Sequence, residues 1–172
     1  MDDVSSVVDY CADPLVRRHM YWRQGQPGSI EMSARRTVAA QGQPVRTYYV
    51  FVITLKPVAT LIGRCFLQNV TSAESASLGW DLNRHYWGQG FAPEAAQAVL
   101  HFAFAEHNLR IVHAYCDQAN LASVRVMEKL GMKCQTDGWR GWALGLAFLR
   151  FGPVVHYALT REMWQAMQPR SG

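Results

Sequence analysis

The run Trp-Gly-Gln-Gly-Phe-Ala-Pro at residues 87–93 joins a segment with the pattern of a strand, 75–82, to one with the pattern of a helix, 93–107. Two glycines one residue apart let the backbone turn tightly and bring several N–H groups to one point. Pro93 suits the first turn of a helix, where its missing N–H group leaves nothing unpaired. Because unpaired N–H groups and the helix dipole both favour an anion, the turn predicts a phosphate-binding loop.

The same turn has a second interpretation, a strand-to-helix connection with a glycine kink and no ligand. Two other nucleotide motifs are excluded by the sequence. There is no G-x-x-x-x-G-K-[ST] run, so the chain has no P-loop, and no third glycine completes G-x-G-x-x-G. The choice between the two interpretations therefore depends on what surrounds the turn.

Periodicity and turn signals predict the other elements. Helices are expected at 4–11, 14–20, 29–40 and 120–130, and strands at 47–55, 60–70, 75–82, 110–116, 133–142 and 154–160. Asp13 and Pro14 combine an N-cap with proline at the first helical position, and Gly131 stands where a C-terminal glycine cap belongs. The order of these elements indicates an α/β protein with a mixed sheet covered by helices.

Length and composition indicate one globular domain, residues 1–172, because 49% of the residues are apolar and only 17% are charged. The longest apolar run, 142–149, is far too short to span a bilayer, and no signal region is apparent. The four cysteines are scattered without a C-x-x-C pair. We therefore expect reduced thiols, no metal site and a cytoplasmic protein without membrane partners.

The net charge of +4 suits an anionic ligand such as a nucleotide. The densest basic spots are only pairs, Arg17-Arg18 and Arg35-Arg36. This distribution argues against a nucleic-acid partner, which would favour a larger basic cluster.

Three segments, 78–95, 120–132 and 156–164, make the sequence resemble the GNAT superfamily of N-acetyltransferases, and within it the Rim-type ribosomal-protein acetyltransferase group. Their order and spacing match that group over most of 13–165. The resemblance implies a GNAT-like sheet, mixed and mostly antiparallel, with a splayed central strand pair and helices on both faces. It also implies acetyl-CoA as the cofactor and an amine, either a protein N-terminus or a small molecule, as the acceptor.

The resemblance places the cofactor contacts in four positions. The pyrophosphate loop would use the backbone N–H groups of Trp87, Gly88, Gln89, Gly90, Phe91 and Ala92. The strand end from Trp80 to Leu82 would pair with the pantetheine arm, and a bulge there would splay this strand from the one at 110–116. Asn120 would bind the pantetheine arm, or act only as a helix cap. Lys129 would reach the ribose phosphate, or be a solvated charge.

The acid that protonates the departing thiolate is expected to differ from the family pattern. Many members carry a tyrosine where this chain has Met127, which has no proton to donate. We expect Ser123 to face the sulfur, either donating to it or ordering a water. Departure of the thiolate without a specific acid is the alternative, since a thiol has a moderate pKa.

The general base has several candidates, because an amine must lose a proton to be acylated. Asp81 ranks first, since it lies at the strand end where the thioester is expected. A chain of waters competes with it. Glu74, His113 and His156 are also considered, although a lone histidine on a strand is more often structural and Glu74 is expected in solvent at a hairpin.

Two departures from the Rim-type pattern leave further alternatives open. The apolar flank 142–151, which contains Arg150, predicts an apolar acceptor pocket or a partner surface. Either the family's first strand is absent or the native chain starts upstream of Met1, and an uncovered sheet edge would then favour a homodimer. With Met127, these departures motivate a non-catalytic acyl-CoA-binding or regulatory module. The positive charge motivates a tRNA-acetylating toxin.

Overall fold

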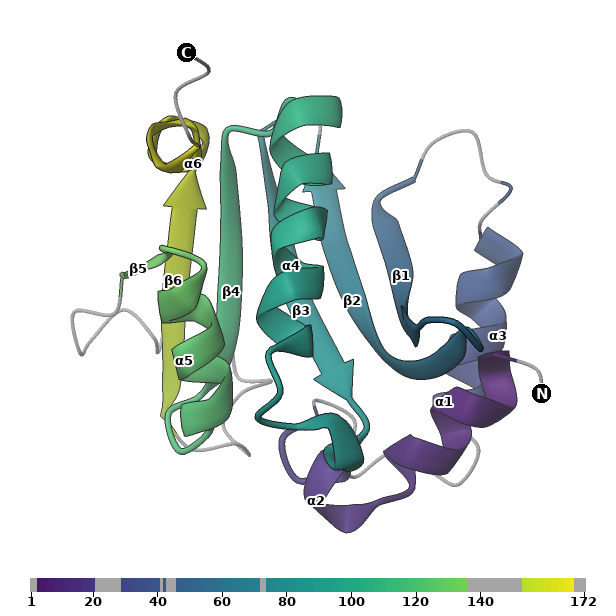
Figure 1. Ribbon diagram of the computed structural model, residues 1–172. Coiled ribbons are helices and arrows are strands. Elements are labelled where there is room, and N and C mark those ends of the chain that lie inside the picture. The colour runs from purple at the N-terminus through teal and green to yellow at the C-terminus, as the bar shows by residue number, and fades with distance from the viewer. Residues whose placement is uncertain are drawn as a thin grey trace.

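The computed structural model describes residues 3–20, 29–40, 42, 46–71, 74–135 and 153–168, which build a six-stranded sheet with helices on both faces (Figure 1). In order across the sheet, the strands are β1 (Tyr48–Leu55), β2 (Thr60–Thr71), β3 (Ser75–Leu82), β4 (Ile111–Asp117), β6 (Val154–Thr160) and β5 (Lys133–Cys134). All neighbours are antiparallel except β3 and β4, which are parallel. The expected mixed, mostly antiparallel sheet is confirmed.

The two central strands diverge after a short paired stretch. β3 and β4 pair only where residues 75–77 lie beside residues 111–113, although β3 continues to Leu82 and β4 to Asp117. We call the diverging parts of these two strands the strand fork. The expected splay is therefore present, but the expected bulge at 80–82 is wrong. β3 keeps a continuous register with β2 from Ser77 to Leu82, and the register shift lies at the other end of β3.

The helices follow the sequence signals closely. They are α1 (Asp3–Cys11), α2 (Pro14–Arg17), α3 (Ser29–Ala40), the 3-10 turn η1 (Arg84–Tyr86), α4 (Phe91–His101), the π-helical turn η2 (Phe102–Glu106), α5 (Leu121–Lys129) and α6 (Arg161–Met167). The Asp13 carboxylate accepts a hydrogen bond from the Leu15 N–H at 2.8 Å, which caps α2 as predicted. The helix expected at 93–107 begins two residues earlier and ends in η2.

Two segments near the C-terminus differ from the expectation. The sequence patterns predict no helix after β6, but α6 begins at Arg161, with the Thr160 hydroxyl accepting a hydrogen bond from the Met163 N–H at 3.3 Å. Of the strand expected at 133–142, the described part is the two-residue β5, and residues 136–142 lie outside the described residues.

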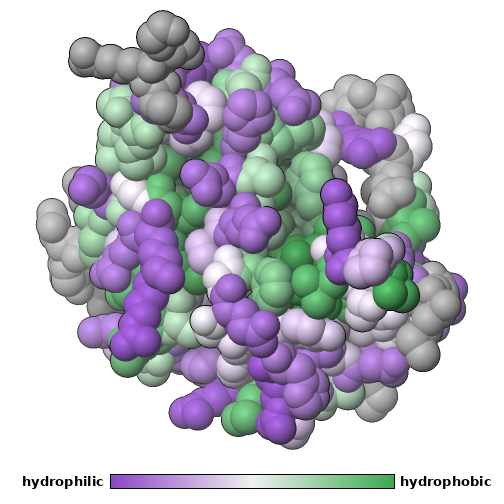
Figure 2. Space-filling model, viewed as in Figure 1, coloured by the Kyte–Doolittle hydropathy of each residue, from purple (hydrophilic) through white to green (hydrophobic). Residues whose placement is uncertain are grey.

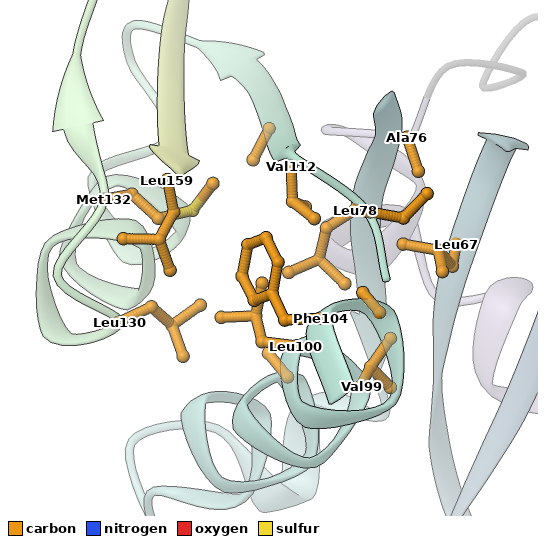
Figure 3. Packing of buried hydrophobic residues seen from close by; sticks show 14 of the residues in the cluster. Leu67, Ala76, Leu78, Val99, Leu100, Phe104, Val112, Leu130, Met132 and Leu159 are labelled. Carbon is orange, nitrogen blue, oxygen red and sulfur yellow. The ribbon is translucent and has the colours of Figure 1, made fainter. Parts of the chain in front are cut away.

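The main core lies between the sheet and the helices α4 and α5. In Figure 3, Leu100 and Phe104 of the α4–η2 helix point between Leu78 of β3 and Val112 of β4. Leu159 of β6 packs at the edge of this cluster that lies beyond β4. We call this side of the sheet the front face. The outward surfaces of α4 and α5 carry hydrophilic side chains, as amphipathic helices covering a sheet should (Figure 2).

A second cluster lies under the N-terminal helices and joins α1 and α2 to β2. Its buried members are Val7, Tyr10, Cys11, Val16, Met20 and Leu61. Successive side chains of a strand alternate between faces. Since Ala76 and Leu78 of β3 point into the main core, Ser77, Gly79 and Asp81 point to the opposite side, which we call the rear face. Asp81 meets Tyr10 of α1 there.

The edge of the sheet beside β1 bears on the expected homodimer. β1 pairs with β2, and within the described residues no other strand lies beside it. The second subunit stays a prediction. Among the described helices, none combines the length and apolar character needed to cross a bilayer.

Candidate active site

The loop from Trp87 to Ala92 connects β3, through η1, to α4. Gly88 and Gly90 have φ values of 75° and 91°, and Gly90 is the N-cap of α4. Both angles lie in the left-handed region, which side chains disfavour. A Cβ atom added to either glycine would meet no heavy atom within 4 Å. These glycines are therefore required by the backbone conformation, and the space beside the loop is open.

The loop presents a row of unpaired backbone donors. Within the described residues, no acceptor pairs with the N–H groups of residues 88–92, which directly precede or begin α4. The first N–H groups of a helix have no partner inside the helix, and they point toward its N-terminal end. Their direction and the dipole of α4 favour an anion such as a pyrophosphate. The predicted phosphate-binding residues thus have the donors that this chemistry requires.

Side chains hold the loop against the end of β3. The indole Nε1 of Trp87 donates a hydrogen bond to the Leu82 carbonyl at 2.8 Å. The Gln89 amide nitrogen donates to the His85 carbonyl at 3.0 Å. The preceding turn is capped by Asn83, whose side-chain oxygen accepts from the His85 N–H. The loop is therefore fixed from both sides before any ligand binds, which reduces the entropy lost on binding.

A second helix begins at the same end of the sheet. β3 and β4 are parallel, so α4 and α5, which follow them, both start at the carboxyl ends of these strands (Figure 1). In α5, the Ser123 N–H donates to Asn120 Oδ1 at 3.2 Å, so the predicted cap is present. The predicted contacts at the turn, at Asn120 and at Ser123 therefore flank the strand fork, the position where open α/β sheets bind ligands.

Three further residues from the sequence analysis lie in surroundings unlike those of the loop. Trp80 is half-buried against the main core, so its side chain points to the front face. Met127 is fully buried in the same core, where a tyrosine was expected in the family pattern. Lys129 is exposed in the last turn of α5, eight residues and about 12 Å from the start of that helix. The contact of Lys129 with the ribose phosphate stays a prediction.

Asp81 lies in a buried ionic cluster on the rear face. Its Oδ2 is 2.5 Å from an Arg64 guanidinium nitrogen, and its Oδ1 accepts from Arg64 Nε at 3.1 Å and from the Tyr10 hydroxyl. Burial, followed by the charge of Asp81, raises the pKa of Tyr10, so the phenol stays protonated. Both carboxylate oxygens are occupied. This geometry favours a role in fixing α1 to β2 and β3 over the expected role as general base.

The other expected bases fall into two groups. Glu74 is exposed at the start of β3, with its Oε2 3.3 Å from Arg110 Nη1. His113 and His156, considered separately in the sequence, are in contact: His113 Nδ1 is 3.0 Å from His156 Nε2. Tyr115 stacks on His156 with ring centroids 4.6 Å apart. Only the register between β4 and β6, which places Tyr115 opposite His156, reveals this cluster.

The remaining predicted features concern the cysteines, a metal site and the apolar flank. All four cysteines are free, two of them buried. No group of three or more His, Cys, Asp or Glu side chains among the described residues is arranged to hold a metal ion. The apolar flank 142–151 and Arg150 lie outside the described residues.

Comparison with known proteins decides the family. The acetyltransferase (GNAT) domain matches residues 1–133. The chain belongs to the GNAT acetyltransferases. It is 32% identical over 121 residues to YnaD of Bacillus subtilis (strain 168), an uncharacterized N-acetyltransferase, and this alignment covers 66% of the chain and 65% of YnaD. The chain thus spans just under two thirds of the length of that relative. The narrower Rim-type resemblance stays a prediction.

Solved structures agree with this assignment. A GNAT-family acetyltransferase from Bacillus anthracis has a TM-score of 0.75 and 25% identity, covering 93% of this chain and 90% of that one. The spermidine N-acetyltransferase of Vibrio cholerae, solved in complex with CoA and spermine, also has a TM-score of 0.75, at 15% identity, with coverage of 95% and 92%. The second likeness shows the fold. GNAT acetyltransferases use acetyl-CoA, whose phosphates suit the unpaired donors of the loop.

Proposed function

We propose that this GNAT protein transfers the acetyl group of acetyl-CoA directly to an amine, either a protein N-terminus or a small molecule. One observation carries the proposal: the unpaired N–H groups of residues 88–92 stand at the open end of the strand fork, where α4 and α5 both begin. An anion and an extended arm would both find partners there. Rim-type membership and the function of residues 1–172 as one domain belong to the same proposal.

The loop would hold the phosphates, and the fork would hold the arm. Beyond Ser77, the backbone edge of β3 that faces β4 has no strand beside it in the described residues. An extended pantetheine arm carries amides that would pair with this edge between Trp80 and Leu82. On the opposite side of the fork, the Asn120 side chain uses its Oδ1 for the helix cap, which leaves its amide nitrogen to donate.

The chemistry needs a proton acceptor for the amine and a proton source for sulfur. Acetyl-CoA supplies a thioester, whose thiol leaving group has a moderate pKa. Ser123 lies in the first turn of α5, half-buried, and its hydroxyl would donate to the sulfur or order a water. Holding the amine beside the thioester would supply a large part of the rate, because orientation removes an entropic barrier.

Isothermal titration of the purified chain with acetyl-CoA tests the first step. We expect saturable binding, and no detectable heat at any cofactor concentration would contradict the proposal. A thiol-release assay with a panel of N-terminal peptides and small amines tests the second step. We expect acceptor-dependent release of CoA.

The competing function is a non-catalytic acyl-CoA-binding module. Met127 favours it, since this position is buried in the core and offers no acid. Titration and thiol release separate the two functions. Binding without turnover on every acceptor would favour the module, and acceptor-dependent turnover would exclude it.

A further inference from the structure

The acceptor amine has two possible directions of approach to the strand fork. On the front face, α4 packs on β2 and β3 while α5 packs on β4, so both arms of the fork are covered. The rear face of β4 and β6 is different. His113, Tyr115 and His156 on this face are half-buried rather than buried, so they retain contact with solvent. An acceptor that meets the thioester in the fork would therefore come from the rear face.

The histidine pair stands at the closed end of the fork on that face. His113 is the last residue of β4 that pairs with β3, opposite Ser77. The next rear-facing position on β3 is Gly79, which has no side chain. The imidazole of His113 is thus beside the point where β3 and β4 begin to diverge, and the Phe66 ring of β2 lies against Gly79 on the side away from β4.

The contact within the pair couples the tautomers of the two rings. His113 Nδ1 and His156 Nε2 are 3.0 Å apart, so one of them donates a proton to the other. When His113 Nδ1 is the donor, its Nε2 carries the lone pair, and no described residue pairs with that nitrogen. The ring stacking of Tyr115 on His156 holds the accepting ring in place. A base oriented by a second group is the arrangement that enzymes use to activate nucleophiles.

We infer that His113 Nε2 takes the proton of the acceptor amine and that His156 is the positioning residue that fixes the His113 tautomer. This inference rests on the proposed acetyl transfer. The amine nitrogen bonds to the thioester carbonyl carbon, the C–S bond breaks with its electron pair on sulfur, and the amine proton passes to His113 Nε2. The resulting imidazolium keeps its Nδ1–H directed at His156 Nε2, which stabilises the charge.

Partial burial favours the neutral form of both imidazoles. Burial lowers the pKa of His113, and burial followed by the neighbouring His113 lowers the pKa of His156. The ionisable groups on the strands of the same face are Tyr115 and Asp117 on β4, Asp81 on β3, Arg64 on β2 and, by its register opposite Ala158, Lys133 on β5. Asp81 is neutralised by Arg64. Asp117, two positions beyond Tyr115, accepts a hydrogen bond from the Ala119 N–H through Oδ1 at 2.8 Å.

The test compares wild type with His113→Gln, His113→Ala, His156→Gln and, as a matched control, His101→Gln on the exposed side of α4. We expect His113→Gln to lower kcat by about 100-fold or more, the size of a lost general base. The acetyl-CoA affinity should change less than about twofold, since the loop is untouched. His101→Gln should match wild type. Added imidazole should restore part of the activity of His113→Ala.

The pH dependence separates a base from a merely structural ring. In wild type, the rate should rise with pH through a pKa below the ordinary histidine value of about 6.5, because the base must be neutral. Histidine NMR of the ligand-free protein should show the same low titration, absent in His113→Gln. His156→Gln should shift the pH at which the rate rises, and it should lower kcat more than it changes KM.

Several results would overturn the inference while leaving acetyl transfer intact. One is a His113→Gln enzyme with wild-type kcat and pH profile. Another is a wild-type enzyme whose rate does not change with pH in the range where histidines titrate. This measurement needs no variant, so it applies even if a substitution unfolds the chain. Failure of wild type to bind acetyl-CoA would instead reject the proposed function, so the two failures are distinguishable.

Discussion

The guanidinium of Arg64 on β2 lies directly opposite the carboxylate of Asp81 on β3, and neither side chain is more than 7% exposed. Tyr10 of α1 donates to the same carboxylate and accepts from Arg64 Nε at 3.1 Å. Charges are buried in proteins only when they are paired and hydrogen-bonded. The cluster therefore ties an N-terminal helix to the strand that ends beside the cofactor loop.

Replacing one member of this pair leaves the other charge buried. We expect Asp81→Asn or Arg64→Met to lower the free energy of unfolding by about 3–5 kcal/mol, the cost of breaking a buried ion pair. The double variant Arg64→Met/Asp81→Leu should recover much of that loss, because no unpaired charge then stays inside. Urea denaturation followed by circular dichroism measures all three.

An exposed ion pair within the chain provides the control. Arg35 and Glu31 on α3 are 2.8 Å apart, but their side chains are 65% and 48% exposed. Glu31→Gln should change the unfolding free energy by less than about 0.5 kcal/mol. Equal costs for Glu31→Gln and Asp81→Asn would reject the structural role of the buried pair. A stable Asp81→Asn enzyme without turnover would restore the expected role of Asp81 as base.

The left-handed glycines of the cofactor loop give a second prediction. Gly90→Ala places a Cβ at φ 91°, where the cost is strain of about 1–2 kcal/mol rather than a clash, since the space is open. The loop should relax away from the donor arrangement, and the Kd for acetyl-CoA should rise about five- to thirtyfold. Isothermal titration measures the change.

Gly42→Ala serves as the matched control for that experiment. An added Cβ at Gly42 also meets nothing within 4 Å, and its φ is not in the left-handed region. The same substitution there should leave the affinity for acetyl-CoA unchanged. Equal affinities for Gly90→Ala and wild type would show that the positive φ is not needed for binding.

Local signals predicted the cofactor half of the site well, because its structure is local. Two glycines and a proline determine how the chain leaves η1 and enters α4, and Asn120 caps the helix that immediately follows it. Each feature depends on residues within about four positions. The start of α4 two residues before Pro93 is within the usual uncertainty of helix ends.

The acceptor half depends on register, which sequence patterns do not determine. His113 and His156 are 43 residues apart, and they meet because β4 and β6 pair antiparallel with Tyr115 opposite His156. Asp81 was expected beside the thioester, but its pairing with Arg64 across β2 and β3 comes from the same kind of long-range register. The position of Asp81 at the end of a strand indicated an active-site carboxylate, but Arg64 on the neighbouring strand β2 is its counter-ion.

Asn120 has two roles to separate, and one pair of substitutions does so. Its Oδ1 caps α5 through the Ser123 N–H, and its amide nitrogen is proposed to bind the pantetheine arm. Asn120→Asp keeps the capping oxygen but loses the amide donor, whereas Asn120→Ala loses both. In thermal unfolding, Asn120→Ala should therefore be less stable than wild type by about 1 kcal/mol, whereas Asn120→Asp should be close to wild type.

The two Asn120 variants should rank differently in acetyl-CoA affinity than in thermal stability. If the amide donates to the arm, Asn120→Asp loses that hydrogen bond despite its intact cap, and its Kd for acetyl-CoA should rise about threefold to tenfold, the effect of one neutral hydrogen bond. Asn120→Ala should bind at least as weakly. An Asn120→Asp protein that binds acetyl-CoA as tightly as wild type would limit this residue to the cap, and the arm would then depend on the backbone edge of β3 alone.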